Sequence, residues 1–209
     1  VRIYDPFHEV KSSLAKHRVK INSVASLDPS SKTFVADARL QGDAFSLPEG
    51  GHAVHWVESS KSLISSLLMH SASYPAYEGR RNLNTVRELL LHGRTFTTPA
   101  GETLTGMPGL WAEMQHNKAA RGVIAGAGAS FASKSVNESS AILSTARRNT
   151  DFLDIEAVQD SLDADQVDFR DLKRKPMTLY FCVPPSRLAD CSPVFRMVLN
   201  MLFPAMEQE

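Results

Sequence analysis

Basic side chains placed near helix ends offer the clearest chemistry in this sequence, which is the binding of anionic groups. The positions concerned are Arg80, Arg81, Arg87, Lys118, Arg121, Arg147 and Arg148. Guanidinium groups bind phosphate and carboxylate oxygens through paired hydrogen bonds. The functional interpretation is therefore a docking surface for DNA phosphate or for an acidic protein partner. The alternative is that these residues form a solvated surface and helix ends.

Two large apolar side chains lie just after a polar loop and form a second candidate contact. Trp111 and Met114 follow the Thr-, Gly- and Pro-rich stretch 95–109. Aromatic residues and methionine are frequent anchors at protein interfaces. The same residues at helical spacing are also typical of a core, so both roles stay open.

The motifs of nucleotide and acyl chemistry do not occur in this sequence. A phosphate-binding loop ends in Gly-Lys-Ser/Thr, and the dipeptide Gly-Lys is absent. Gly126 and Gly128 lie inside a helical pattern rather than after a strand, which favours helix packing. No Gly-x-Ser-x-Gly elbow is present, and Cys182 falls in a predicted strand, which favours burial. We therefore expect no catalysis by this chain alone.

A metal site has one weak candidate. His52, His55 and Glu58 could approach one ion, but their spacing matches no established ligand signature, and a helix start explains them more simply. The sequence therefore predicts no metal.

Bulk composition describes a folded protein without a strong electrostatic field. Hydrophobic residues make up 43% of the 209 positions, which is enough for a real core. Lys+Arg and Asp+Glu both number 23, so any contact with DNA needs a local basic patch. Cys182 and Cys191 do not make a disulfide framework and are expected to be reduced thiols. No transmembrane run is visible.

The elements that would position these residues are mostly helices. Apolar periodicity predicts helices over 31–41, from 52 towards 70, 83–92, around 110–114, 118–132, 135–148 and 155–162. The stretch 8–20 could hold a short helix, and Leu47–Gly51 is a firm break. Asn82 or Asn84 is a candidate cap for the third of these helices, and Asp154 for the last.

Strands are predicted only near the two ends. The first contains Val1, Ile3 and Tyr4, and the second is the β-branched and aromatic run Met177–Val183. A double proline stops the second strand, and a helix is then expected with Ser192 as cap and Pro193 in its first turn, up to Pro204. If the two strands lack other partners, we expect them to pair with each other or to drive self-association.

Several stretches, taken together and in order, resemble the VirD4/TraG family of type IV secretion and conjugation coupling proteins. They are I-Y-D-P-F (3–7), H-W-V-E-S-S-K-S-L-I (55–64), T-V-R-E-L-L (85–90), S-A-I-L-S-T-A-R-R-N-T-D-F-L-D (140–154), V-D-F-R-D-L-K (167–173) and the strand and helix over 175–203. The arginine-containing block 140–154 is the most specific of these stretches for the family.

The resemblance implies a fold and a place in a larger protein. Family members carry a membrane anchor and a RecA-like motor domain, with an all-α domain inserted between the Walker A and Walker B motifs. This chain is similar to the part between those motifs. It is thus expected to be mainly α, a helical bundle inserted in remnants of an α/β motor sheet. The implied limits are 1–30 for a motor strand and connector, 31–172 for the all-α domain and 173–209 for the return to the motor.

The resemblance also implies a function. The family's all-α domain helps to select secretion substrates at the cytoplasmic face of the bacterial inner membrane. Expected partners are secreted effector proteins, or a relaxase with accessory proteins, and other secretion components; single-stranded DNA is a further candidate. ATP and Mg²⁺ serve the full-length family protein, and none is expected here. The alternative is a DNA-contacting or subunit-interface part of a hexameric, DNA-translocating ATPase.

Overall fold

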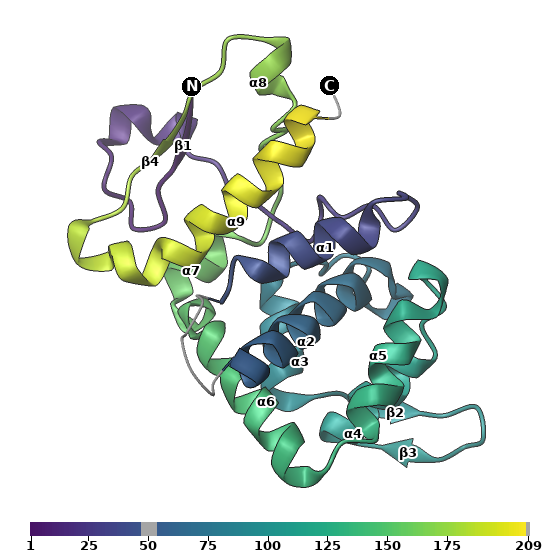
Figure 1. Ribbon diagram of the computed structural model, residues 1–209. Helices are drawn as coiled ribbons and strands as arrows, with labels where there is room; N and C mark the ends of the chain where they lie inside the picture. Colours follow the sequence, from purple (N-terminus) through teal and green to yellow (C-terminus); the bar gives the residue numbers. More distant parts are fainter. Residues whose placement is uncertain (47–53, 208–209) are drawn as a thin grey trace.

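The computed structural model describes residues 1–46 and 54–207, and it is mainly α-helical (Figure 1). The two longest helices among these residues are α2 (Val54–Ser73) and α9 (Leu188–Glu207). The other α-helices are α1 (Phe34–Asp43), α3 (Leu83–His92), α4 (Gly106–Gln115), α5 (Val123–Ala132), α6 (Val136–Asn149), α7 (Glu156–Ser161) and α8 (Asp171–Arg174). The strands are β1 (Arg2–Tyr4), β2 (Phe96–Thr97), β3 (Thr103–Leu104) and β4 (Leu179–Phe181).

Helix α2 is the centre of the helical body, with α1, α3, α5 and α6 packed around it (Figure 1). Its apolar stripe of Leu63, Ile64, Leu67 and Leu68 is fully buried. Because these positions recur every three or four residues, they lie along one side of a helix. The sequence periodicity therefore predicted this helix and its buried face correctly.

Helices α4 and α5 cross closely at a glycine. A Cβ added to Gly128 would lie 2.8 Å from the Met114 Cβ and 2.8 Å from the Trp111 carbonyl oxygen. Only a residue without a side chain allows this approach, so the packing role expected for Gly128 is confirmed. At Gly126 an added Cβ would meet nothing within 4 Å.

The two predicted terminal strands pair with each other. Strands β1 and β4 are parallel, with Ile3 opposite Tyr180 and Tyr4 opposite Phe181. The Tyr4 and Phe181 rings lie 5.4 Å apart, and Phe181 in turn contacts Phe195 of α9 at 4.9 Å. Helix α9 therefore covers one face of this small sheet, as expected for a strand followed by an amphipathic helix.

Helix α9 departs from the prediction at both ends. It begins at Leu188 rather than after Ser192, and it continues through Pro204 to Glu207. Each proline removes one backbone hydrogen bond, but contacts with α1 hold the helix in place. Arg196 Nε donates to the Ala44 carbonyl at 2.7 Å, and Asn200 Nδ2 donates to the Leu40 carbonyl at 2.5 Å.

Two further predictions need correction. Asp154 does not cap α7, because the N-cap position of that helix is Ile155. The Asp154 carboxylate forms an ion pair with Arg87 instead. The stretch 95–109, which was expected to be a loop, contains the β2–β3 hairpin. Each of its strands has two residues, which is too short to give a recognisable sequence pattern. Asn82 is the cap of α3, where its side chain accepts a hydrogen bond from the Thr85 amide.

Some predicted features lie outside the described residues, namely the break at Leu47–Gly51 and His52 of the weak metal candidate. The proposed domain limits stay a prediction. Within residues 1–46 and 54–207, no helix has the length and apolar character required to cross a membrane.

Candidate functional site

A buried polar network lies where the end of α2 meets α4. His70 is fully buried, and its Nε2 lies 3.0 Å from Glu113 Oε1. Its Nδ1 lies 3.0 Å from Asn117 Nδ2. Because an amide nitrogen only donates, Nδ1 accepts, and the ring proton on Nε2 points to the Glu113 carboxylate. The imidazole thus has a defined orientation.

Glu113 collects further donors in this network. The Tyr77 hydroxyl donates to Oε1, and Arg94 Nε donates to Oε2 at 3.3 Å. Desolvation by itself would raise the pKa of Glu113, but hydrogen bonds from His70 and Tyr77 and the charge of Arg94 outweigh it and lower that pKa. Burial and the same hydrogen bond raise the pKa of Tyr77. Glu113 is therefore ionised, and its carboxylate holds the side chains of His70, Tyr77 and Arg94 in place.

Two partly exposed guanidinium groups flank the Tyr77 ring, which is itself fully buried. Arg80 lies 5.9 Å and Arg94 lies 5.7 Å from the ring centroid. Arg80 also pairs with Glu88 at 2.9 Å, and both of those side chains are about half exposed. We call Tyr74, Tyr77, Arg80 and Arg94 the Tyr77 cluster. Its two arginines and the half-buried Tyr74 reach the surface, and the buried Tyr77 ring lies beneath them.

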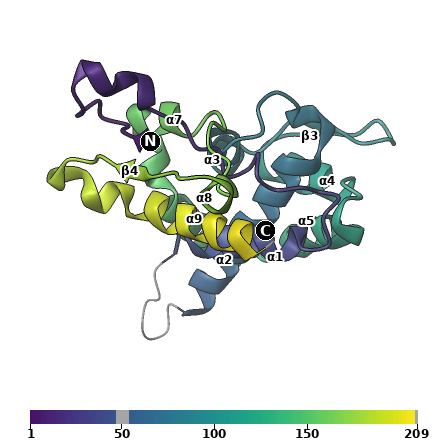
Figure 2. The same ribbon diagram turned by 90° about the horizontal axis from the view of Figure 1, so that it is seen from above.

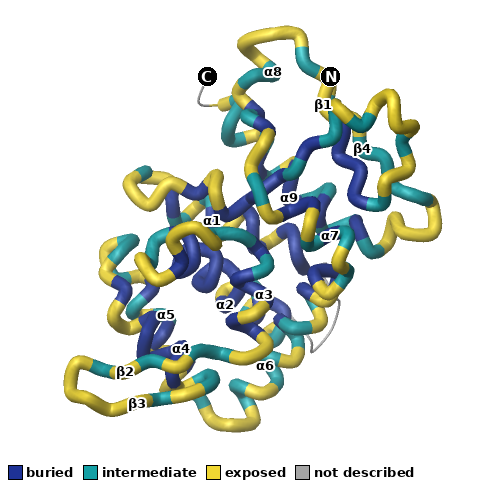
Figure 3. The backbone as a smooth tube through the Cα atoms, turned by 180° about the vertical axis from the view of Figure 1, so that it is seen from behind, coloured by how far each residue is buried: buried dark blue, intermediate teal, exposed yellow. Residues whose placement is uncertain are grey.

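The β2–β3 hairpin leaves the body next to this cluster. Arg94 precedes β2, and its amide donates to the Gly106 carbonyl at 2.9 Å. Gly93 has φ +66, and an added Cβ there would lie 2.1 Å from the Gly106 carbonyl carbon. Figure 2 shows the hairpin projecting away from β1 and β4, and Figure 3 shows that its tip is exposed. The hairpin is thus a protruding element on a tightly packed base.

The structure spreads the predicted basic residues over several places. Arg80 joins the Tyr77 cluster, whereas Lys118 and Arg121 are exposed ahead of α5. Arg148 is exposed and already engaged in an interaction. Arg81 is half-buried, and its Nε has no hydrogen-bond partner among the described residues.

Arg87 and Arg147 hold helices together. Arg87 is buried and donates to Asp154, to the Arg147 carbonyl and to Thr150 Oγ1. Arg147 donates to the carbonyls of Leu90 and Leu91 at the end of α3. Both guanidinium groups thus form hydrogen bonds within the molecule, and these two arginines have a structural role.

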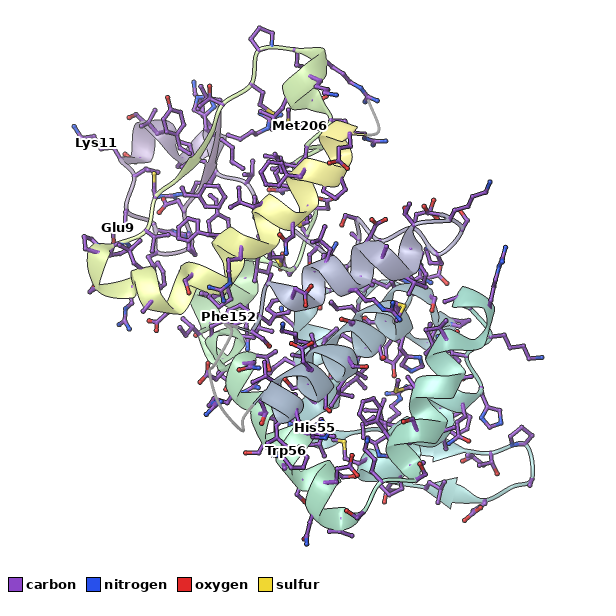
Figure 4. All side chains as sticks on the ribbon, viewed as in Figure 1. Glu9, Lys11, His55, Trp56, Phe152 and Met206 are labelled. Atoms are coloured by element: carbon purple, nitrogen blue, oxygen red, sulfur yellow. The ribbon has the colours of Figure 1, made fainter. Side chains whose placement is uncertain are left out.

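Trp111 and Met114 are buried in the core, with exposed fractions of 6% and 0%. The Trp111 ring stacks on Phe131 at 5.2 Å. The sequence left open whether these two side chains contact a partner or form part of the core, and in the structure they lie in the core. Phe152, which is labelled in Figure 4, is another buried aromatic side chain, and its ring stacks on that of Phe45 with the centroids 5.8 Å apart.

Sequence reasoning missed Arg94, Glu113 and His70. The one available signal was Glu113, a carboxylate within an apolar helical stretch, which requires buried partners. These three side chains meet only because of the way α2 and α4 pack, and a local sequence pattern does not predict that packing. The cluster offers guanidinium charge and hydrogen bonds for binding, and its one partly accessible ring is that of Tyr74. Within the described residues, no group of three metal-ligating side chains is placed to hold an ion.

Comparison with known proteins adds one finding. A family model described as type IV secretory system conjugative DNA transfer matches residues 1–209. No match is found among curated proteins.

Proposed function

We propose that this chain, which belongs to the type IV secretory system conjugative DNA transfer family, recognises secretion substrates and presents them to the secretion channel. The substrates would be secreted effector proteins, or a relaxase with its accessory factors. Recognition would take place by surface complementarity, at the cytoplasmic face of the bacterial inner membrane. ATP hydrolysis would belong to other parts of the full-length protein.

The observation that supports this proposal is the Tyr77 cluster beside the projecting hairpin. Arg80 and Arg94 flank Tyr77, and Glu113 fixes Arg94 and Tyr77 from below. Side chains held in place lose little conformational entropy on binding, which favours affinity. Arginine is also one of the residue types enriched among interface hot spots, and Arg80 and Arg94 are accessible members of the cluster. A partner with acidic groups would fit this surface, because Arg80 and Arg94 are its accessible charged groups.

A test compares two charge reversals on the same protein. The chain serves as bait for lysate of its own bacterium, and captured proteins are identified and then purified for titration. Arg80→Glu should weaken binding of a captured effector or relaxase at least about tenfold, because it reverses a charge at the cluster. Arg39→Glu is the control, because Arg39 is exposed on α1 outside the cluster. Equal loss with both variants would refute recognition at the Tyr77 cluster.

The second candidate is a DNA-contacting or subunit-interface part of a hexameric ATPase. The partly exposed guanidinium groups of Arg80 and Arg94 are also a suitable contact for the phosphate groups of a nucleic acid. Titration of single-stranded DNA at several salt concentrations distinguishes the two. Affinity that falls steeply with salt and is lost in Arg80→Glu would favour DNA contact. Binding of an ATP analogue by the chain would favour a role at the nucleotide site.

A further inference from the structure

A groove on the helical body lies between α1 and α5, with α2 as its floor. Figure 1 shows α1 and α5 on either side of α2. The groove has a volume of about 510 Å³, and Val123, Gly126, Ala127 and Ser130 of α5 form one wall. A Cβ added to Gly126 would meet nothing within 4 Å, so the groove is open above this glycine. Another helix can therefore approach α5 closely along this wall.

The outer face of α5 lacks the charges that a solvated helix surface usually carries. The stretch 122–133 contains no charged residue. Nevertheless Val123, Gly126, Ala129, Ser130 and Ala132 are exposed. Helices at a protein surface typically present charged or polar side chains to water. An uncharged outer face of small side chains is instead typical of a helix that packs against another helix.

Ser65 on the groove floor is an independent sign that a contact is missing. It lines the groove and is only 4% exposed, yet its hydroxyl forms no hydrogen bond with the described residues. Unlike the unpartnered oxygens of Ser23 and Ser71, its Oγ is not enclosed by the protein. It faces Gly42 of α1, where an added Cβ would lie 2.2 Å from it, so the glycine leaves it uncovered. A polar group that enters the groove would satisfy this hydroxyl.

Basic residues mark the end of the groove at which α5 begins. Asn117 Nδ2 donates to Ser73 Oγ at 2.9 Å, which places the start of α5 beside the C-terminal end of α2. Lys118 and Arg121 follow, and both are exposed. Among the ion pairs formed within residues 1–46 and 54–207, none includes either of them. This end of the groove is therefore cationic.

Acidic residues mark the opposite end. Asp43 is the last residue of α1 and lies 3.7 Å from Lys61 of α2, and Glu58 pairs with the same lysine at 2.9 Å. The two carboxylate side chains are 57% and 63% exposed, so both remain accessible. One lysine neutralises only one of two carboxylates, so this end keeps a net negative charge. The groove thus favours a helix whose basic end lies beside Asp43 and Glu58.

We propose that a second copy of this chain occupies the groove, and that the two copies form a two-fold symmetric dimer. A two-fold axis makes the α5 helices of the two copies antiparallel and gives each copy the same contacts. The small side chains of each α5 then pack in the groove of the other copy. Lys118 and Arg121 of one copy reach Asp43 and Glu58 of the other. The orientation that the symmetry requires is thus the one that the charges favour.

Sedimentation velocity of the intact chain at increasing concentration tests the dimer. We expect a monomer–dimer equilibrium, which Arg121→Glu and Glu58→Arg should each weaken at least about tenfold, because each sets like charges against each other. An equimolar mixture of these two variants should dimerise again, because both charge pairs across the axis then join opposite charges. Arg2→Glu is the matched control, since Arg2 is exposed on β1, outside the groove.

A second pair of variants tests the packing. Ser130→Trp fills the groove and should abolish the dimer, whereas Ala132→Trp adds the same side chain to an exposed position of α5 outside the groove and should not. Thermal unfolding of each variant confirms that the fold is retained.

A chain that stays monomeric up to about 100 µM would overturn the proposal. So would a mixture of Arg121→Glu and Glu58→Arg that fails to dimerise, or an equal loss with Arg2→Glu. These outcomes are independent of the Arg80→Glu experiment, because they are measured on the purified chain without a substrate and the groove shares no residue with the Tyr77 cluster.

Discussion

Arg87 and Asp154 form a two-point ion pair in which only one partner is buried. Arg87 Nε lies 2.8 Å from Asp154 Oδ1, and Nη2 lies 2.5 Å from Oδ2. The arginine side chain is 7% exposed, whereas the aspartate side chain is 54% exposed. The pair links α3 to the turn before α7 and fixes the end of α6 through the Arg147 carbonyl. Its two members should therefore respond differently to mutation.

We predict that Asp154→Asn destabilises the fold more than Arg87→Met does. The first variant leaves a buried guanidinium without its counter-charge, which should cost about 2–3 kcal/mol. The Arg87→Met variant removes the buried charge and keeps an apolar side chain, so it should lower the free energy of unfolding by only about 1 kcal/mol. The Arg147 carbonyl would still accept from the Thr150 amide at 3.3 Å. Urea unfolding at neutral pH measures both free energies.

The pH dependence gives this prediction a second readout. Hydrogen bonds from Arg87 lower the pKa of Asp154, so the pair stabilises the fold above the unfolded-state pKa of the aspartate. That stabilisation is lost as the pH falls through the lower, folded-state pKa. The difference between wild type and Asp154→Asn should thus shrink in acid. A larger cost for Arg87→Met than for Asp154→Asn would contradict this account.

Glycine substitutions in α5 form a matched pair. Gly128→Ala places a methyl group 2.8 Å from Met114 and from the Trp111 carbonyl, so we expect a loss of about 1–3 kcal/mol. Gly126→Ala enters open space in the same helix and should gain up to about 1 kcal/mol from helix propensity. Thermal unfolding of the two variants should shift in opposite directions. Shifts of the same sign would show that the α4–α5 crossing adapts.

These positions show how far the sequence predicts the fold. Helix periodicity placed α2, α3 and α6 within a few residues, because a buried stripe repeats locally. The helix predicted over 118–132 begins only at Val123, since Arg121 just before it has a non-helical φ of 53°. The pairing of β1 with β4 was also predicted, since exposed strand edges need partners. The limits of α9 were wrong because proline rules are local, whereas Arg196 and Asn200 hold that helix on α1 from a distance.

The candidate site was predictable only in part. Arg80 was named from its basic neighbourhood, but Arg94 and Glu113 were not, because they meet only through the packing of α2, α4 and the hairpin base. Arg87 and Arg147 share the residue type of Arg80 and yet serve the interior. Residue type alone does not distinguish a surface arginine from one that satisfies buried carbonyl groups.

The bond between Tyr4 and Ser161 tests how β1 is attached to α7. The Tyr4 hydroxyl lies 2.8 Å from Ser161 Oγ, which in turn donates to the Val158 carbonyl at 2.7 Å, so the tyrosine is the donor. Tyr4→Phe should cost about 1 kcal/mol, because it leaves the serine oxygen without its buried donor. A double-mutant cycle with Ser161→Ala should give a coupling of similar size. Additive single effects would show that this bond contributes nothing measurable.

Glu113 should control the stability of the helical body as a function of pH. Its pKa is lowered in the folded chain, because donors from His70, Tyr77 and Arg94 outweigh desolvation. Such a carboxylate stabilises the fold above its unfolded-state pKa, and the contribution disappears as the pH falls through the folded-state pKa. We therefore expect Glu113→Gln to cost about 2–4 kcal/mol at pH 7 and progressively less in acid.

Glu102→Gln is the control for this prediction, because Glu102 is exposed at the hairpin tip. It should change the free energy of unfolding by less than about 0.5 kcal/mol at every pH. Equilibrium unfolding of wild type and both variants between acidic and neutral pH makes the comparison. A cost of Glu113→Gln that stays constant across this range would mean that the carboxylate charge does not stabilise the network. Shape and neutral hydrogen bonds alone would then hold the Tyr77 cluster.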